Sequence, residues 1–435
     1  MALFSPDTLE RVCSSVAARL DQRTSLMFRE CFANTLATTI EELSDGTAFV
    51  ITGDIPAMWL RDSTAQLTPY LHFLDDDACL ADTVARISRR QLRLVLHDPY
   101  ANAFNRSPNS AGHATDLTDM SPWVWERKYE VDSLCYPIQL AHDLWRLTGR
   151  TDHLADFQAV ARVVIVLWHT EQDHECGSPY SFQRLGAPGS DTLAREGRGR
   201  LVAPTGLTWS AFRPSDDACD LGFNIPGNMF AAVELGHIAE IASGVFDDDQ
   251  LVGAADELRH EIEEGIRLHG IVQRPADTDI YAYEVDGRGN HLLMDDANVP
   301  SLLSLPLLGW CDNEDPLYLS TRAFMLSTRN PYFHRGSAAS GQGSPHTPKG
   351  TVWPIALAVQ GLTAVTDEEK QAVLRTLVNT DAGTNLMHES FHKDDPTIFT
   401  RAWFSWANAM FCELVLDVAG LRTHTRRALA ATVES

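Results

Sequence analysis

Long apolar stretches are missing from this sequence of 435 residues. The longest candidates, VVIVLW from Val163 and SLLSLPLLGW from Ser301, have the length of core segments and fall short of the roughly 20 residues that span a bilayer. The first residues, MALFSPDTLERVCSS, contain neither a basic region nor a long apolar run, so no secretory signal is predicted. We therefore expect a cytoplasmic protein that has no membrane partner.

Cysteine is sparse and irregularly placed. The eight cysteines have no CxxC spacing, and most lie in apolar surroundings of helical pattern. This distribution favours buried, reduced thiols over a disulfide framework or a zinc site.

Basic residues are in short supply. The chain has 35 Lys and Arg against 59 Asp and Glu, which gives a net charge of −24. Such a surplus of negative charge repels phosphates, so nucleic acid and anionic membranes are disfavoured as partners. A neutral ligand is compatible with it.

Strand patterns are few, whereas helical periodicity dominates. Residues 48–51 (AFVI) and 281–285 (YAYEV) read as short strands, the second followed by an Asp-Gly turn, and both are predicted to form small hairpins in loops. Apolar residues at i, i+3, i+4 and i+7 predict a series of helices. The clearest cover 7–21, 76–97, 132–148, 152–170, 226–243, 248–268, 315–328, 367–379 and 400–419.

The chain also contains six polar clusters, each followed by an apolar segment of helical pattern. They are GDIPAMWLRDSTAQ from Gly53, WERKYEVDSLCYP from Trp125, FRPSDDACDLGFNIP from Phe212, LMDDANVPSLL from Leu293, PHTPKGTVWP from Pro345 and HESFHKDDPTIFTRAWFSWAN from His388. Aromatic faces beside carboxylates and guanidinium groups suit a sugar, which needs an apolar surface and forked hydrogen-bond partners. The pattern therefore favours a carbohydrate-active enzyme.

Helices that alternate between polar-ended and ordinary indicate an inner and an outer ring. The prediction is an all-α (α/α)6 toroid, with small β-hairpins in its loops, as one catalytic domain over 1–435 and with the ligand at the loop-rich mouth. An irregular all-α domain is the alternative.

The first cluster offers Asp54, Trp59, Arg61 and Asp62 within nine residues. Arg61 beside Asp62 can bind two adjacent sugar hydroxyls while Trp59 covers an apolar face. Asp62 can instead cap a helix that starts at Ser63, and both roles can hold together.

The third cluster places Asp216 and Asp217 side by side, after Ser215. Burial raises the pKa of a carboxyl group that must stay protonated, and hydrogen bonds keep its neighbour ionised, which is the usual environment of a general acid. Helix capping by Ser215 and the two aspartates is an equally open interpretation.

The sixth cluster contains His388, Glu389 and His392 in the HExxH order of zinc proteases. That motif needs a helix to bring both histidines to one face, and the flanking Gly383 and Pro396 leave little room for one. Glu389 is therefore interpreted as a general base on a loop, and a metalloprotease remains the weakest alternative.

On these motifs the sequence resembles glycoside hydrolase family 125, the metal-independent exo-α-1,6-mannosidases. The matching segments are TGDIPAMWLRDSTAQ, GHATDLTDMSPWVWERKYEVDSLCYP, FRPSDDAC, MDDANVPSLL and HESFHKDDPTIFTRAWFSWANAMF, which extend from about residue 50 to 415. The resemblance implies an (α/α)6 fold and an inverting mechanism with two carboxylates and neither metal nor cofactor. It implies Asp216 as the acid, with Asp217 as its close rival, and Glu389 as the base.

The expected ligand is the terminal mannose of an oligosaccharide. The residues expected to bind it, from motif position and chemistry, are Asp54, Trp59, Arg61, Asp62, Asp132, Asp217, Asn298 and Arg401. Inversion requires room for a water molecule, so the two carboxyl groups should stand about 6.5–9.5 Å apart. A toroid hydrolase of the glucoamylase or trehalase type and a non-catalytic glycan-binding protein remain alternatives.

Overall fold

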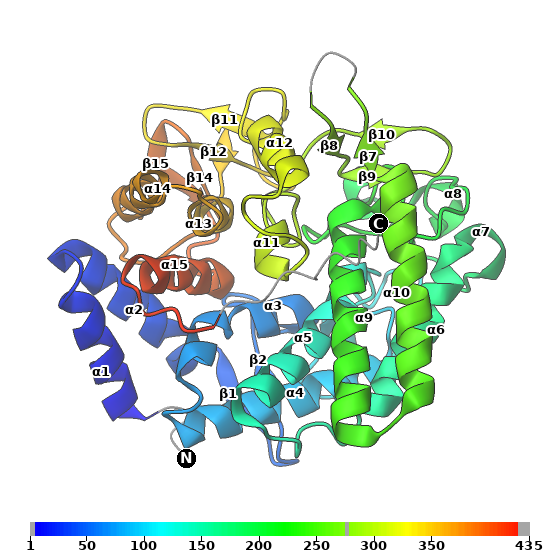
Figure 1. Ribbon diagram of the computed structural model, residues 1–435, viewed down its shortest axis with the longest axis horizontal. Coiled ribbons are helices and arrows are strands. Elements are labelled where there is room, and N and C mark those ends of the chain that lie inside the picture. Colours follow the sequence, from blue (N-terminus) through cyan, green and yellow to red (C-terminus); the bar gives the residue numbers. More distant parts are fainter. Residues whose placement is uncertain (1–4, 275–277, 425–435) are drawn as a thin grey trace.

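Most helices belong to one of two sets that alternate along the chain and differ in burial. The computed structural model describes residues 5–274 and 278–424 (Figure 1). Within that part, the inner helices are α3 (Leu60–Ala65), α5 (Val131–Thr148), α9 (Ile225–Phe246), α11 (Leu305–Leu308), α13 (Pro354–Leu362) and α15 (Ser405–Val418). The outer helices are α2 (Gln22–Thr38), α4 (Ala78–His97), α6 (Phe157–Gln172), α10 (Asp249–His269), α12 (Pro316–Met325) and α14 (Asp367–Asn379). This inner–outer alternation is the one that the six clusters predict.

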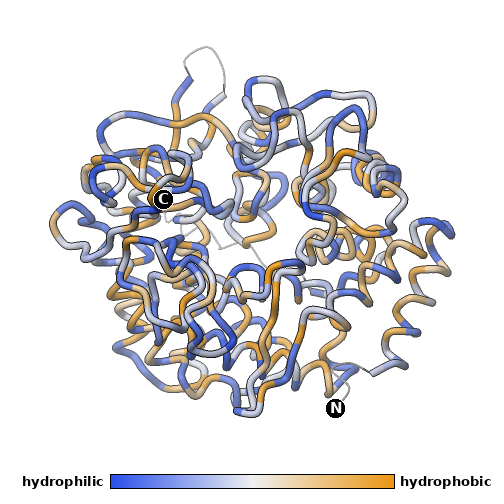
Figure 2. Tube along the Cα trace, turned by 180° about the vertical axis from the view of Figure 1, so that it is seen from behind, coloured by the Kyte–Doolittle hydropathy of each residue, from blue (hydrophilic) through white to orange (hydrophobic). Residues whose placement is uncertain are grey.

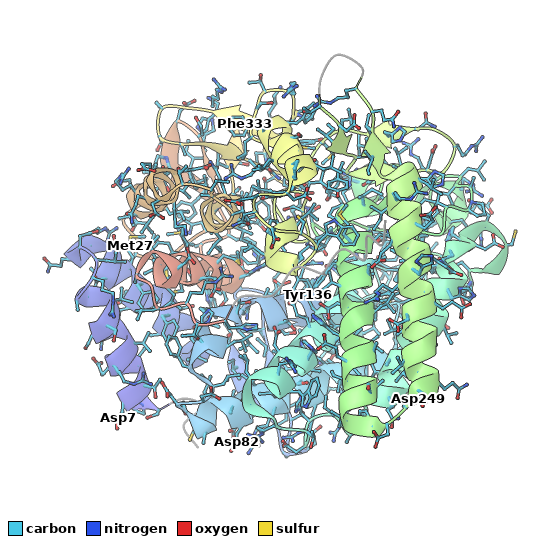
Figure 3. All side chains as sticks on the ribbon, in the orientation of Figure 1. Asp7, Met27, Asp82, Tyr136, Asp249 and Phe333 are labelled. Carbon is cyan, nitrogen blue, oxygen red and sulfur yellow. The ribbon has the colours of Figure 1, made fainter. Side chains whose placement is uncertain are left out.

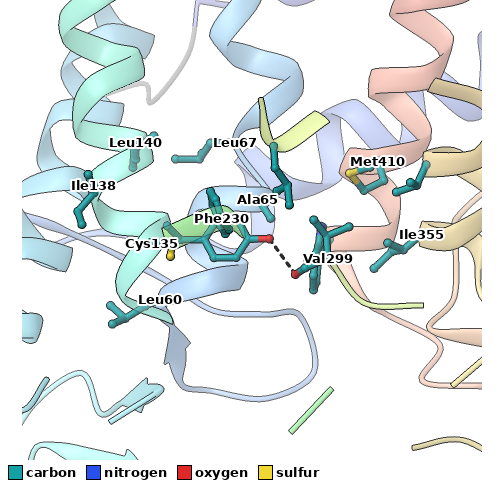
Figure 4. Packing of buried hydrophobic residues seen from close by; sticks show 14 of the residues in the cluster. Leu60, Ala65, Leu67, Cys135, Ile138, Leu140, Phe230, Val299, Ile355 and Met410 are labelled. Carbon is teal, nitrogen blue, oxygen red and sulfur yellow. Dashed lines mark hydrogen bonds between the residues drawn. The ribbon is translucent and has the colours of Figure 1, made fainter. Parts of the chain in front are cut away.

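The inner helices meet in an apolar centre (Figure 4). Leu60, Phe230, Ile355 and Met410 come from four different inner helices and are buried in one hydrophobic cluster. That cluster extends along the chain from Val12 to Leu416. The single domain over 1–435 stays a prediction, and its range includes residues outside the described part.

Some charged residues of the outer and peripheral helices are exposed, Asp7, Asp82 and Asp249 among them. Asp7, Asp82 and Asp249 lie at the periphery of the view, whereas Tyr136 lies near its centre (Figure 3). Hydrophilic and hydrophobic stretches alternate along the outer segments of the trace (Figure 2). Each outer helix therefore presents one apolar face inward, as amphipathic helices do.

Helix α9 is apolar on all sides. By length and composition alone it could cross a membrane, but more than half of it is buried within the protein. It packs between α5 and α10 (Figure 1). A helix that is apolar all round and covered on both sides is typical of the core of a large soluble fold.

The remaining helical segments are short or peripheral. They are α1 (Pro6–Ala17), α7 (His174–Gly177), α8 (Ala194–Gly197) and the 3-10 turns η1 (Thr68–Phe73) and η2 (Gly189–Asp191). The helix expected over 400–419 begins later, at Ser405, because Thr400 ends strand β15 and pairs with Ser390. Helix α2 is an element that the sequence analysis did not anticipate.

The strands form small antiparallel sheets. They are β1 (Ile40–Glu42) with β2 (Ala48–Val50), β3 (Met58–Trp59) with β4 (Ala103–Phe104) and β5 (Val124–Glu126), β6 (Phe223–Asn224) with β9 (Glu284–Val285) and β10 (His291–Leu292), β7 (Ile271–Val272) with β8 (Ile280–Tyr281), β11 (Phe333–Arg335) with β12 (Ser340–Gln342), and β13 (Thr351–Val352) with β14 (Ser390–His392) and β15 (Asp395–Thr400). The hairpin predicted at 48–51 is present. The single strand predicted over 281–285 is wrong: this segment divides into β8 and β9, which belong to different sheets.

Short strands or loops lead into the inner helices. Strand β3 precedes α3, β5 precedes α5, β6 precedes α9 and β13 precedes α13. The six polar clusters occupy these connections. Their side chains therefore stand at the N-terminal ends of the inner helices, where a site can assemble.

Candidate active site

A cavity of about 150 Å³ lies where five of the six clusters meet. Seven of the residues selected from the sequence line it: Trp59, Arg61, Asp62, Asp216, Asn298, Glu389 and Arg401. The other three selected residues, Asp54, Asp132 and Asp217, do not line this inner cavity. The selected residues thus gather around one cavity, but the sequence did not separate the cavity wall from the layer behind it.

Arg61, in the first turn of α3, is surrounded by carboxylates. Its Nη1 donates to Glu130 Oε2 at 2.6 Å and to Asp132 Oδ2 at 3.1 Å, and its Nη2 donates to Asp216 Oδ1 at 3.0 Å. Its Nε lies 3.6 Å from Asp62 Oδ2. The guanidinium thus holds four carboxylates together, whereas the sequence analysis expected it to bind sugar hydroxyls directly.

Asp132 is buried behind the cavity wall, at the start of α5. Its carboxylate contacts Arg61 and is 2 % exposed, so it is not placed to bind a sugar in the cavity, as the sequence analysis expected. Asp132 does not reach the cavity, because Arg61 lies between the two.

Asp62 is a wall residue but caps no helix. It lies inside α3, whose N-cap position is occupied by Trp59, so the capping interpretation is wrong. Its buried carboxyl instead faces the cavity.

One cation cannot neutralise four carboxylates, three of which are buried, and the pKa values of these groups reflect this. Burial raises the pKa of Asp62 and that of Asp132 to about 6, against the pull of Arg61. Burial, with the nearby charge of Asp216, raises the pKa of Glu130 well above its usual range. Burial alone would raise the pKa of Asp216 as well, but Arg61 and a hydrogen bond with Glu130 hold it below its usual range.

Asp216 sits in a tight turn between Phe212 and Ala218, which bridge across its base. Its φ of 66° lies in the left-handed region, which Asp tolerates better than most residues. Ser215 Oγ donates to Asp296 Oδ2 at 2.7 Å and so ties the turn to the fourth cluster. The capping interpretation of this segment is wrong, because α9 begins only at Ile225 and is capped by Asn224.

Lys128 holds the same turn through its backbone. Its buried Nζ donates to the backbone oxygen of Asp216 at 2.7 Å and also contacts Asp191. The carboxylate of Asp216 is thereby fixed with its side chain about one quarter exposed, and this open part faces the cavity.

Asp217 points to a different partner. Its Oδ1 accepts a hydrogen bond from His346 Nδ1 at 3.2 Å, and its side chain is 8 % exposed. Burial lowers the pKa of His346, but Asp217 outweighs this effect and raises it to about 9. His346 is therefore a cation at neutral pH, placed in the wall of the cavity that Asp216 and Glu389 share.

Glu389 lies across the cavity, immediately before β14. Arg401 Nη1 is 3.6 Å from Glu389 Oε1, and the Arg401 guanidinium also bonds Thr52 Oγ1 at 3.1 Å. Asp54, at the exposed rim, accepts a hydrogen bond from Arg401 Nε at 2.9 Å. Asp54 thus positions Arg401, although the sequence analysis expected it to bind the ligand.

The HExxH segment leads into and forms strand β14, and its two histidines lie in different surroundings. His388 is buried and stacks on Phe399, with ring centroids 3.7 Å apart, while its Nδ1 lies 3.2 Å from the Ala402 oxygen. His392 ends β14 and accepts a hydrogen bond from the Asp394 backbone. The helix that a zinc protease needs is not formed at residues 388–392, so the metalloprotease interpretation loses its basis.

Sequence reasoning missed several wall residues. His346, Trp353 and Trp406 line the cavity, and Glu130 lies directly behind it. All four belong to the six polar clusters, which was the available signal.

A second, larger cavity of about 550 Å³ adjoins the first. The two share Ile55, Trp59, Asp216 and His346. Trp125, His113 and Asp217 line the outer cavity but not the inner one. Asp216 therefore stands at the passage between a small inner chamber and a wider outer one.

Comparison with known proteins places the chain among glycoside hydrolases. The family model of metal-independent alpha-mannosidase (GH125) matches residues 21–416. A solved structure of a metal-independent alpha-mannosidase from Streptococcus pneumoniae, in a non-productive complex with α-1,6-mannobiose, is 50% identical. Its TM-score is 0.95, and the match covers 97% of this chain and 100% of that one.

Two further relatives extend the comparison. The meiotically up-regulated gene 157 protein of Schizosaccharomyces pombe is 40% identical, over 97% of this chain and 87% of that protein. Glucoamylase from Saccharomycopsis fibuligera shares 12% identity with a TM-score of 0.59, covering 93% and 97% of the two chains. At that identity the likeness concerns the fold alone, and it confirms the predicted (α/α)6 class.

Proposed function

Because this chain belongs to the family of metal-independent α-mannosidases, glycoside hydrolase family 125, we propose that it removes terminal α-1,6-linked mannose from oligosaccharides with inversion. The linkage is that of the mannobiose bound to the Streptococcus pneumoniae enzyme. The observation that carries the proposal is the meeting of Asp216 and Glu389, distant in sequence, in the wall of one small cavity.

The inner chamber holds the mannose that is released. It is the smaller of the two cavities and lies beyond the passage at Asp216, which suits attack at a chain end. Trp59 gives the ring an apolar face, and Asp62, Asn298 and Arg401 lie in the wall with polar groups for its hydroxyls. His346 adds a cation that the sequence analysis did not include.

Asp216 is the general acid in this proposal and Glu389 the general base. Asp216 gives its proton to the glycosidic oxygen as the bond from C1 to that oxygen breaks. Glu389 takes a proton from a water molecule that attacks C1 on the opposite face. The buried carboxylates around Arg61 favour the positive charge that develops on the ring.

Three of the expected ligand residues take supporting roles. Asp132 holds Arg61, Asp54 holds Arg401, and Asp217 holds His346. Each contact fixes a charged side chain of the cavity wall, so each aspartate acts on the sugar through that neighbour.

The proposal is tested by following hydrolysis of α-1,6-mannobiose by proton NMR in the presence of EDTA. We expect β-mannose to be the first anomer formed, because a single displacement at C1 inverts its configuration. We also expect an unchanged rate with the chelator, as in a metal-independent family.

Each alternative gives a different outcome in this assay. Release of α-mannose first would exclude inversion, and faster cleavage of a glucose disaccharide would favour a glucoamylase-like specificity. Binding of mannobiose without hydrolysis would favour a glycan-binding protein.

The outer cavity receives the remainder of the oligosaccharide. The exposed part of Trp125 faces this cavity, and the Trp125 ring packs edge-on against His113, with centroids 6.5 Å apart. Gly112 lies so close that a Cβ there would come within 2.6 Å of the indole. The ring is thus held in a fixed position, as a stacking platform for a sugar requires.

We expect Trp125→Ala to lower kcat/KM for α-1,6-linked mannotriose by about 3- to 10-fold, the loss of one stacking contact. Hydrolysis of an aryl α-mannoside, which places no second sugar in the outer cavity, should change less than about 2-fold by the same argument. Steady-state kinetics on both substrates measure the difference.

Trp123 offers a matched control two residues earlier, just before β5. It packs against His97 and Arg90 and is not part of the outer wall. Trp123→Ala should therefore leave the ratio of the two kcat/KM values unchanged. An equal loss on both substrates in Trp125→Ala would show that the indole merely supports the fold.

A further inference from the structure

Glu130 is a buried carboxyl group that the proposed mechanism leaves without a task. Its side chain is 0 % exposed and lies immediately before α5. It accepts hydrogen bonds from Arg61 Nη1 at 2.6 Å and from Ser133 Oγ at 2.8 Å. It is not part of the inner wall, so it cannot act on a sugar directly.

Glu130 and Asp216 are nevertheless paired. The Nδ2 of Asn102 lies 3.4 Å from Glu130 Oε1 and 3.3 Å from Asp216 Oδ1, so one amide spans both groups. Arg61 likewise bonds both, through Nη1 and Nη2. Glu130 and Asp216 therefore share two hydrogen-bond donors, which bring their carboxyl groups together at one place beside the inner cavity. Two carboxyl groups held this way by the same donors favour one shared proton, because two adjacent anions repel each other.

We propose that Glu130 and Asp216 hold one proton between them, and that Glu130 is a positioning residue which supplies this proton to the acid. The inference rests on the proposed function, since it assigns Asp216 as the proton donor. It also removes a conflict: beside Arg61 and Lys128, an isolated Asp216 would be ionised at neutral pH and would have no proton to give.

The proton balance of the cycle is complete. The O–H bond of Glu130 breaks as one forms on Asp216, and the Asp216 proton then moves to the glycosidic oxygen while the C1–O electron pair leaves with that oxygen. Water bonds to C1 and loses its proton to Glu389, which returns it to solvent. A solvent proton re-enters the pair through Asp216, whose side chain is open to the cavities.

Charged groups surround this pair on every side. They are Arg61 and Asp62 from α3, Glu126 from β5, Lys128 and Asp132 beside Glu130, Asp191 against Lys128, Asp217 next to Asp216, His346 before β13 and Glu389 before β14. The cations Arg61, Lys128 and His346 favour ionisation of Asp216. The buried position of Glu130 and the adjacent anions favour its protonated form.

The test is Glu130→Gln, which keeps the size of the side chain and a hydrogen-bond donor toward Asp216 but holds no transferable proton. We expect kcat on α-1,6-mannobiose at neutral pH to fall by about 10²- to 10³-fold, as when general acid catalysis is lost. On 2,4-dinitrophenyl α-mannoside, whose leaving group needs no proton, kcat should fall less than about 10-fold.

The pH profile gives a second signature. In the native pair, loss of the proton leaves two adjacent anions and is resisted, so activity persists as pH rises. In Glu130→Gln, Asp216 titrates alone beside Arg61 and Lys128, and its pKa stays low. The alkaline limb of kcat should therefore move toward acid by at least about one pH unit.

Asp132→Asn is the matched control. Asp132 also accepts a hydrogen bond from Arg61, but Asn102 connects Asp216 to Glu130 and not to Asp132. Asp132→Asn should lower kcat on both substrates by similar factors. The same uniform loss in Glu130→Gln, with the alkaline limb unmoved, would overturn the inference.

Should that variant not fold, neutron diffraction of the native protein decides, because a deuteron must lie between Glu130 and Asp216. A native enzyme inactive on both substrates would instead refute the proposed function.

Discussion

Glu389→Gln is expected to fold normally and to lose most of its turnover, with kcat on α-1,6-mannobiose reduced by about 10²- to 10⁴-fold. The amide keeps the shape of the side chain and a contact for Arg401, which stands 3.6 Å from the carboxylate. It cannot accept a proton from the attacking water, so the nucleophile stays weak. Steady-state kinetics with thermal unfolding of the same preparation check activity and folding together.

Azide provides a sharper readout for the same variant. As an anion it needs no base, so it should restore turnover of 2,4-dinitrophenyl α-mannoside in Glu389→Gln and give β-mannosyl azide. Asp395→Asn is a suitable control, because its exposed carboxylate on β15 bonds the neighbouring Thr397 and is not part of the cavity. Near-native turnover of Glu389→Gln on mannobiose would remove Glu389 from the role of base.

The ring architecture was predictable because its signals are local. Each inner helix follows a polar cluster, and most outer helices have an apolar stripe, so periodicity and cluster position order most of them along the chain. The outer helix α2 is the exception, because no helix was predicted over its residues. The strands at 280–285 were less accessible. The amide of Ala282 bonds Gly270 and that of Tyr283 bonds Leu292, so the partners that divide this segment lie at distant positions.

The candidate site was predictable as a set of residues but not as a set of distances. The side chain of Arg61 contacts Glu130, Asp132 and Asp216, which lie 69, 71 and 155 positions away. Whether such a carboxylate faces the cavity or stands behind an arginine depends on how the helices pack. Composition and spacing carry no such information, and Asp132 was assigned to the sugar for that reason.

Glu130 and His346 show the same limit, as residues of the site that the sequence did not single out. Both lie in clusters that the sequence marks as polar, yet nothing adjacent distinguishes them from Glu126 or Lys349. Their importance arises from contacts across the ring, Glu130 with Asp216 and His346 with Asp217. Only the assembled fold places these pairs.

The choice between two neighbouring aspartates gives the second large expected effect. Asp216→Asn should lower kcat on α-1,6-mannobiose by about 10²- to 10⁴-fold but kcat on 2,4-dinitrophenyl α-mannoside by far less, because only the first leaving group needs a proton. Asp216 has the geometry for this role, since it stands at the passage between the inner and outer cavities, where the bond to be cleaved must lie.

Asp217→Asn is the natural comparison, one residue along the same turn. The Asp217 carboxylate bonds His346 and lines the outer cavity but not the inner one. Loss of this carboxylate should therefore weaken sugar binding and affect both substrates to a similar degree. Kinetics of both variants on both substrates separate the roles, since a lost acid makes the rate depend strongly on the leaving group and a lost support does not. If the strong dependence appeared in Asp217→Asn and not in Asp216→Asn, the acid would be Asp217, and the pairing of Glu130 with Asp216 would lose its catalytic meaning.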